Sequence, residues 1–152
     1  MSAGDAQAWF IAGTIVVMVA GGGHVLLALV DTIRPRSFAP IESSVKQGME
    51  GTGMLLVRRW RFGGSSARPS IWRVWLGIHI THGLGVFTFG LLCLLIATHD
   101  FGLVERIDAI GPLTIAFPAA YLALSLRFWF YVPAIFAGTA TACFTIATLL
   151  SA

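Results

Sequence analysis

Four apolar stretches, each long enough to cross a lipid bilayer, constrain this chain more than any other feature of its sequence. They cover about residues 9–30, 71–97, 111–128 and 133–150. A helix needs about 20 apolar residues to cross the hydrocarbon core, where every backbone polar group must be bonded internally. The sequence therefore predicts an all-α fold, an integral membrane four-helix bundle that forms one membrane domain over residues 1–152.

The overall composition agrees with a membrane location. Hydrophobic residues make up 57% of the chain and charged residues 11%, whereas soluble domains carry roughly 25% charged residues. A soluble chain of this length has too small an interior to hide so many apolar side chains. The composition therefore excludes an ordinary soluble domain.

The positive charges are concentrated around one interhelical loop, residues 31–70. Of the ten Lys and Arg residues, eight lie between Arg34 and Arg73 inclusive. The positive-inside rule places this loop in the cytoplasm, so both termini are expected outside a bacterial plasma (inner) membrane. Cations near anionic lipid headgroups contribute about 1 kcal/mol each. Membrane lipids therefore explain the basic balance, and no nucleic acid is expected as a partner.

The same loop is expected to carry a short helix that lies at the membrane interface, over about residues 42–58. Ile41, Val45 and Met49 give this segment a broken apolar face. Its end combines cations suited to lipid phosphates with an indole suited to the interface. The residues of this predicted membrane-surface anchor are Arg58, Arg59, Trp60 and Arg61.

Small residues recur every four positions in two of the predicted spans. This pattern lets helix backbones approach one another closely in a membrane. It favours packing against other helices, including those of other membrane-protein subunits or of a second copy of this chain. The predicted helix-packing positions are Gly77, Thr81 and Gly85 in the second span and Ala134, Gly138 and Ala142 in the fourth.

Three of the four histidines lie inside predicted spans, at similar depth near the cytoplasmic face. His24 lies about 10 Å along the helix from Asp31, and His82 lies about 14 Å from Arg73. His79 precedes His82 by three positions and shares one side of the second span. Ionisable groups within a membrane are costly and usually face the bundle interior, so this cluster is the predicted functional site.

The predicted site is a pocket at the cytoplasmic end of the bundle. Arg127 enters at the same face from the third span, and consecutive glycines leave room for a flat ligand or a neighbouring helix. The candidate ligand-binding residues are His24, His79, His82, Arg127, Gly21, Gly22 and Gly23.

Several uses of the histidines remain open at this point. The imidazoles could bridge helices by hydrogen bonds alone, at about 0.6 kcal/mol per contact. They could bind a quinone, a sterol or a lipid headgroup. Two of them could ligate a haem b iron, with Arg127 on a propionate. The three could instead bind zinc or copper, with His24 and His82 as metal ligands, although Asp31, the one nearby carboxylate, is expected to end its helix.

Four fragments of the chain carry a family resemblance. They are Gly23-His24-Val25-Leu26-Leu27, His82-Gly83-Leu84-Gly85, Phe89-Gly90-Leu91-Leu92 and Leu126-Arg127-Phe128-Trp129-Phe130. In order and spacing they resemble a group of small bacterial four-span inner-membrane proteins that carry no assigned reaction. The resemblance implies the four-span fold and no mechanism.

Common catalytic signatures are absent from the sequence. It contains no Ser-His-Asp set, phosphate-binding loop, Cys-x-x-Cys or His-Glu-x-x-His motif. We therefore expect a non-enzymatic protein, either an accessory subunit of a membrane complex or a binder of a lipophilic ligand. The alternative is a haem- or metal-binding membrane redox protein that uses His24 with His79 or His82.

Overall fold

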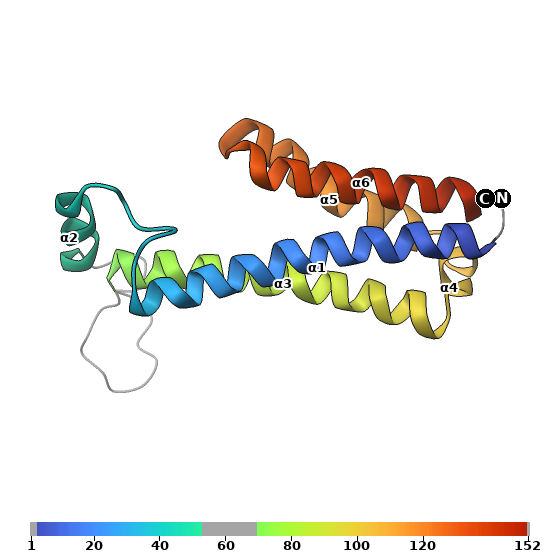
Figure 1. Ribbon diagram of the computed structural model, residues 1–152, viewed down its shortest axis with the longest axis horizontal. Coiled ribbons are helices and arrows are strands. Elements are labelled where there is room, and N and C mark those ends of the chain that lie inside the picture. The colour runs from blue at the N-terminus through green and yellow to red at the C-terminus, as the bar shows by residue number, and fades with distance from the viewer. Residues whose placement is uncertain (1–2, 53–69, 152) are drawn as a thin grey trace. The chain divides into compact units, whose positions relative to one another are not determined.

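The computed structural model describes residues 3–52 and 70–151, which fold into six α-helices without a strand. Four of these helices are long and apolar enough to cross a membrane, namely the first, third, fifth and sixth. The predicted all-α class and the four helices of membrane-spanning length are therefore confirmed. Figure 1 shows the helices α1 (Ala3–Ile33), α2 (Ser43–Gly51), α3 (Ile71–His99), α4 (Gly102–Arg106), α5 (Ile110–Phe128) and α6 (Tyr131–Ser151).

Each long helix extends beyond the apolar stretch that predicted it. In α1 the extension is clear, because the helix begins at Ala3 and includes polar residues ahead of the apolar run. Asp5 lies in the first turn, where a negative charge interacts favourably with the helix dipole. The Gln7 amide donates a hydrogen bond to the carbonyl oxygen of Ala97 at 2.7 Å. Hydropathy alone misses the first turns of α1 because they contain polar side chains. The helix dipole stabilises Asp5, and a hydrogen bond to α3 satisfies Gln7.

Residue contacts divide the chain into two compact units. The first comprises Met1–Gly22 and Leu84–Ala152, and the second comprises Gly23–Gly83. The helices α1 and α3 contribute residues to both units, whereas α4, α5 and α6 belong to the first. The candidate site residues are therefore divided between the two units: Gly21, Gly22 and Arg127 belong to the first, and Gly23 and the three histidines belong to the second.

Phe10 lies in the apolar core of the first unit. Its side chain is fully buried and makes edge-to-face contacts with Phe101 and Phe144, at centroid separations of 5.6 and 5.0 Å. Such aromatic pairs contribute about 0.5–1.5 kcal/mol beyond the burial of their area. Two small buried residues of α6, Ala140 and Ala147, complete this part of the core. In the same unit α5 and α6 form an antiparallel hairpin (Figure 1).

The small residues of α6 pack within the first unit only in part. Ala134 is buried and Gly138 approaches Leu122 of α5, but Ala142 is exposed. A strict spacing of four drifts by about 40° per step around a helix of 3.6 residues per turn. Ala142 has therefore left the face that α6 presents to its own unit, and Ala140 takes its place in the core.

The small residues of α3 contact no other helix within the described part of the chain. A Cβ atom at Gly77 or Gly85 would meet no described atom within 4 Å. Thr81 is exposed, and its hydroxyl donates a hydrogen bond to the Gly77 carbonyl oxygen at 2.9 Å. Helix packing at these positions is therefore a prediction about another chain.

One helix, α4, is absent from the sequence-based prediction. It occupies the loop between the second and third spans and buries Val104 in the apolar core. Arg106 pairs with Asp100, which joins the two ends of this short segment. A helix of five residues is too short for hydrophobic periodicity to reveal it.

A short helix, α2, lies within the range 42–58 where an interfacial helix is predicted, and it ends at Gly51, while residues 53–58 of that range lie outside the described residues. Ile41 and Val45 are exposed, as expected for a segment that lies on a membrane surface. That location remains a prediction. The predicted anchor Arg58, Arg59, Trp60 and Arg61 lies outside the described residues.

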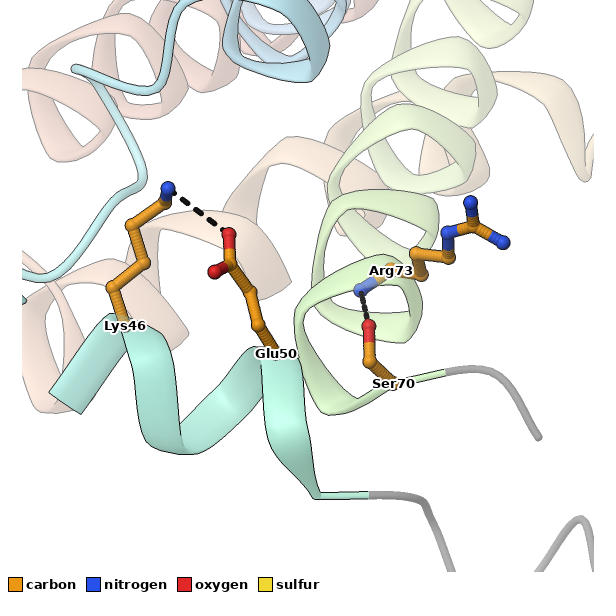
Figure 2. Close-up of polar contacts among 4 residues, drawn as sticks. All are labelled: Lys46, Glu50, Ser70 and Arg73. Carbon is orange, nitrogen blue, oxygen red and sulfur yellow. Dashed lines mark hydrogen bonds and ion pairs between the residues drawn. The ribbon is translucent and has the colours of Figure 1, made fainter. Parts of the chain in front are cut away.

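In the second unit, polar contacts stabilise α2 and the first turn of α3, and a cation–π contact joins the two helices. Lys46 pairs with Glu50 at 3.0 Å and lies 5.8 Å from the centroid of the Trp72 ring. Figure 2 shows the Lys46–Glu50 pair near the first turn of α3, where the Ser70 hydroxyl accepts a hydrogen bond from the Arg73 amide. A serine in this position satisfies an otherwise unbonded amide and begins the helix.

Gly90 marks a close approach of α3 to α1, which generates a stability prediction. A Cβ atom at Gly90 would lie 3.2 Å from the Met18 backbone nitrogen and 3.3 Å from the Thr14 carbonyl oxygen. We expect Gly90→Ala to lower the free energy of unfolding by about 1–3 kcal/mol, because backbone atoms must move apart. Gly85→Ala, on the same helix but facing open space, should change it by less than about 0.5 kcal/mol. Unfolding of the purified variants in detergent measures both, and equal stabilities would contradict the close packing.

Candidate functional site

The three histidines predicted to cluster do come together, within the second unit. His24 Nε2 lies 3.1 Å from His79 Nδ1, so the two imidazoles share a hydrogen bond between α1 and α3. The ring centroids of His24 and His82 are 5.2 Å apart. The sequence-based expectation that these side chains lie at one level of neighbouring helices is therefore confirmed.

Helical spacing explains why α3 supplies several neighbouring side chains. Residues three or four positions apart lie on one side of a helix. Trp75, His79 and His82 follow this spacing, and the Trp75 ring meets the His79 ring edge-on at 4.6 Å. One side of α3 thus carries an indole and two imidazoles toward His24.

Phe38, from the link between α1 and α2, covers this group. Its ring stacks on the His79 ring at 4.1 Å with an interplanar angle of 24°. It also lies 4.9 Å from the His24 ring. Trp75 Nε1 donates a hydrogen bond to the Phe38 carbonyl oxygen at 3.1 Å. These five residues, His24, Phe38, Trp75, His79 and His82, are called the histidine site below.

Asp31 determines the path of the chain that carries Phe38. Its side chain is fully buried two residues before α1 ends. Oδ1 accepts hydrogen bonds from the backbone amides of Arg36 and Ser37, each at 3.0 Å, and Oδ2 accepts one from Phe38 at 2.6 Å. A carboxylate near a helix C-terminus is opposed by the helix dipole. Three amide donors offset this cost because hydrogen bonds to an ionised group are strong.

One atom of the histidine site lacks a hydrogen-bond partner. His79 is 9% exposed, and its Nε2 is buried with no partner among the described residues. The other ring nitrogen already bonds His24, so the tautomer of that pair decides whether Nε2 donates or accepts. Leaving such an atom unbonded costs about 1–3 kcal/mol. His79 Nε2 is therefore the atom of this site that most calls for an external partner.

The glycines predicted to line the pocket have different surroundings. Gly21 is buried, and a Cβ atom at Gly22 would lie 3.4 Å from the Phe87 ring, a contact within the first unit. A Cβ atom at Gly23 would meet no described atom within 4 Å. Gly22 therefore allows a phenyl ring to pack against α1, and Gly23 borders open space one position from His24.

Arg127, the remaining predicted ligand-binding residue, belongs to the first unit. It is exposed in the last turn of α5, and its guanidinium carbon lies 5.2 Å from the centroid of the Phe128 ring. The histidine site is formed by second-unit residues alone. The participation of Arg127 in ligand binding stays a prediction.

The described histidines are in direct contact rather than arranged around a vacant centre. Residues 3–52 and 70–151 contain no group of three or more His, Cys, Asp or Glu side chains placed to hold a metal ion. An iron with two axial imidazoles would lie between their nitrogens, whereas here His24 Nε2 and His79 Nδ1 are joined by a hydrogen bond. In this arrangement His24 Nε2 is occupied by His79 Nδ1.

Three contributors to the site were missed as such from the sequence. Trp75 is of a residue type that usually lies at the membrane interface, and Asp31 is expected from the sequence only to end its helix. Phe38 lies in a loop without periodicity, so no local pattern places it on His79. A possible signal was Asp31 before the turn at Pro35, because aspartate side chains often bond the backbone of a following turn.

Comparisons with known proteins yield no match: no family model, no curated protein and no solved structure is similar to the chain. The resemblance to small bacterial four-span inner-membrane proteins therefore stays a prediction.

The bond between His24 and His79 generates a test by double substitution. We expect His24→Phe and His79→Phe each to destabilise the protein by about 1–3 kcal/mol, because each leaves the other imidazole nitrogen unpaired. The double variant should lose less than the sum of the two, with a coupling of about 0.5–3 kcal/mol. Detergent-solubilised unfolding measures the cycle, and His99→Phe, at an exposed histidine, is the control. Additive losses would show that the two imidazoles do not interact.

Proposed function

We propose that this multi-pass membrane protein binds a lipophilic molecule whose neutral head carries a hydrogen-bonding oxygen, and that the histidine site holds this head. The protein acts as a binder and not as an enzyme. The observation that carries the proposal is the buried, unpartnered Nε2 of His79.

Burial makes this atom informative. Buried polar groups in proteins almost always have a hydrogen-bond partner. Inside a membrane an ionisable side chain is costlier still and usually serves a function. A ligand hydroxyl would satisfy Nε2 in either tautomer of the His24–His79 pair, because it can donate or accept a hydrogen bond, whereas a ligand carbonyl oxygen would satisfy Nε2 when that nitrogen carries the proton.

Helix lengths support a position near the membrane surface. With 31 residues, α1 is about 46 Å long, and the hydrocarbon core is about 30 Å thick. An end of α1 must therefore reach the headgroup region, and His24 lies in the last third of this helix. Trp75 adds a residue type that is enriched at the interface. Lipophilic molecules present their polar heads at this depth.

The surroundings favour a neutral head over a phosphate. The buried Asp31 carboxylate bonds the backbone of Phe38, whose ring stacks on His79, so a second negative charge nearby would be repelled. The walls contributed by Phe38 and Trp75 are aromatic, and such side chains line most small-molecule sites. Quinones and sterols share this chemistry of an apolar body with a neutral oxygen.

The other predicted functions differ from this one in what they would leave on the purified protein. An accessory subunit would retain a partner protein, for which the exposed Thr81 and the neighbouring Gly77 of α3 offer a surface. A redox protein that uses His24 with His79 or His82 would retain haem or metal. Both remain predictions from the sequence.

Retention of a small molecule tests the proposal. The protein is purified in mild detergent, and native mass spectrometry and organic extraction report what remains bound. We expect wild type and His99→Phe to retain a lipophilic compound at close to one per chain. His79→Phe, which removes the Nε2 atom but keeps a ring of similar size, should retain at least about tenfold less, equivalent to 1.4 kcal/mol.

Several results would contradict the proposal. One is a folded wild-type protein that retains no small molecule, and another is equal retention by wild type and His79→Phe. A Soret band or stoichiometric metal would favour the redox alternative instead. A co-purified subunit without a bound small molecule would favour the accessory role.

A further inference from the structure

The link from α1 to α2 is fastened beside the histidine site at two points. We call residues 34–40 the strap. At one point the Asp31 carboxylate accepts the strap's backbone amides, including that of Phe38. At the other, Trp75 Nε1 donates to the Phe38 carbonyl oxygen at 3.1 Å. Phe38 is therefore held through both its amide and its carbonyl group.

We infer that Asp31 is a positioning residue of the histidine site: it keeps the strap closed, so that Phe38 covers His79, and its release admits the ligand. This inference rests on the proposed function, because it assigns the control of access to the same site. Asp31 acts through Phe38 and has no contact with the ligand in this account.

Phe38 limits access to the His79 ring. His79 Nε2 is buried, so a ligand reaches it only when a covering group moves. Of the rings packed on His79, those of His24 and Trp75 lie on helices, whose movement would disrupt a helical hydrogen-bond ladder. Phe38 lies between α1 and α2, on irregular backbone. Phe38 is thus the cover that moves at least cost.

The Asp31 carboxylate holds the strap through both of its oxygens. The two oxygens of Asp31 divide the strap between them: Oδ1 holds Arg36 and Ser37, and Oδ2 holds Phe38. In Asp31→Asn the amide oxygen can keep the first two bonds, while the amide nitrogen cannot accept the third. The substitution should therefore free Phe38 selectively and leave the earlier part of the strap fastened.

Chemical modification of His79 measures its access directly. Diethyl pyrocarbonate acylates accessible imidazole nitrogens, and tandem mass spectrometry locates the product. With the full chain in phosphatidylcholine nanodiscs, at a temperature where both proteins stay folded, we expect His79 to react slowly in wild type and at least about tenfold faster in Asp31→Asn. His99 is exposed and serves as the internal reference for reagent activity. Asp108→Asn removes an exposed carboxylate and should leave the His79 rate unchanged.

A second variant separates the cover from the fastening. Phe38→Ala removes the ring but retains the backbone amide that Asp31 holds, so it should accelerate His79 modification while amide exchange at Ser37 stays slow. Phe128→Ala removes an exposed phenyl ring of the first unit and is the matched control. If Asp31 variants fail to fold, Phe38→Ala still decides whether Phe38 limits access.

The results that overturn this inference differ from those that overturn the proposed function. Fast modification of His79 in wild type, or unchanged rates in Asp31→Asn and Phe38→Ala, would show that the strap controls nothing. A folded wild-type protein that retains no lipophilic compound would instead overturn the proposed function, whatever the rates of His79 modification are.

Discussion

The hydrogen bond between His24 and His79 is the interaction on which the candidate site depends. It joins two long apolar helices at a level where unpaired polar groups are expensive. It also uses one nitrogen of His79 and so leaves the other as an orphan. The rings of Phe38 and Trp75 pack against the His79 ring, whose Nε2 is buried. The same contact thus stabilises the packing of α1 on α3 and leaves His79 Nε2 without a hydrogen-bond partner among the described residues.

Asp31 extends this local order into the loop. Its carboxylate lies where the helix dipole opposes it, and backbone amides of the following turn compensate for that position. The same bonds place Phe38 over His79. The bonds that stabilise the end of α1 therefore also hold Phe38 in place over the histidine site. Asp31 can in this way affect both the stability of the helix end and access to His79.

The sequence was sufficient for the features that depend on local pattern. Apolar runs of about 20 residues predicted the four long helices, and the equal depth of the histidines on antiparallel spans predicted that they meet. It failed where distant residues decide the outcome. No periodicity reports that Phe38 folds back onto His79, and α4 is too short to show any. A spacing of four drifts around the helix, so Ala142 lies off the face that α6 presents to its own unit, and its packing against another helix stays a prediction.

The bonding state of His79 Nε2 in a lipid bilayer is the most direct measure of this account. Solid-state NMR of the ¹⁵N-labelled protein in liposomes reports whether that nitrogen is hydrogen-bonded. We expect His79 Nε2 to be hydrogen-bonded in the protein as isolated, and its resonance to shift when detergent exchange strips lipophilic compounds from the protein. A resonance that is unaffected by stripping, in a protein that stays folded, would show that no ligand completes the site.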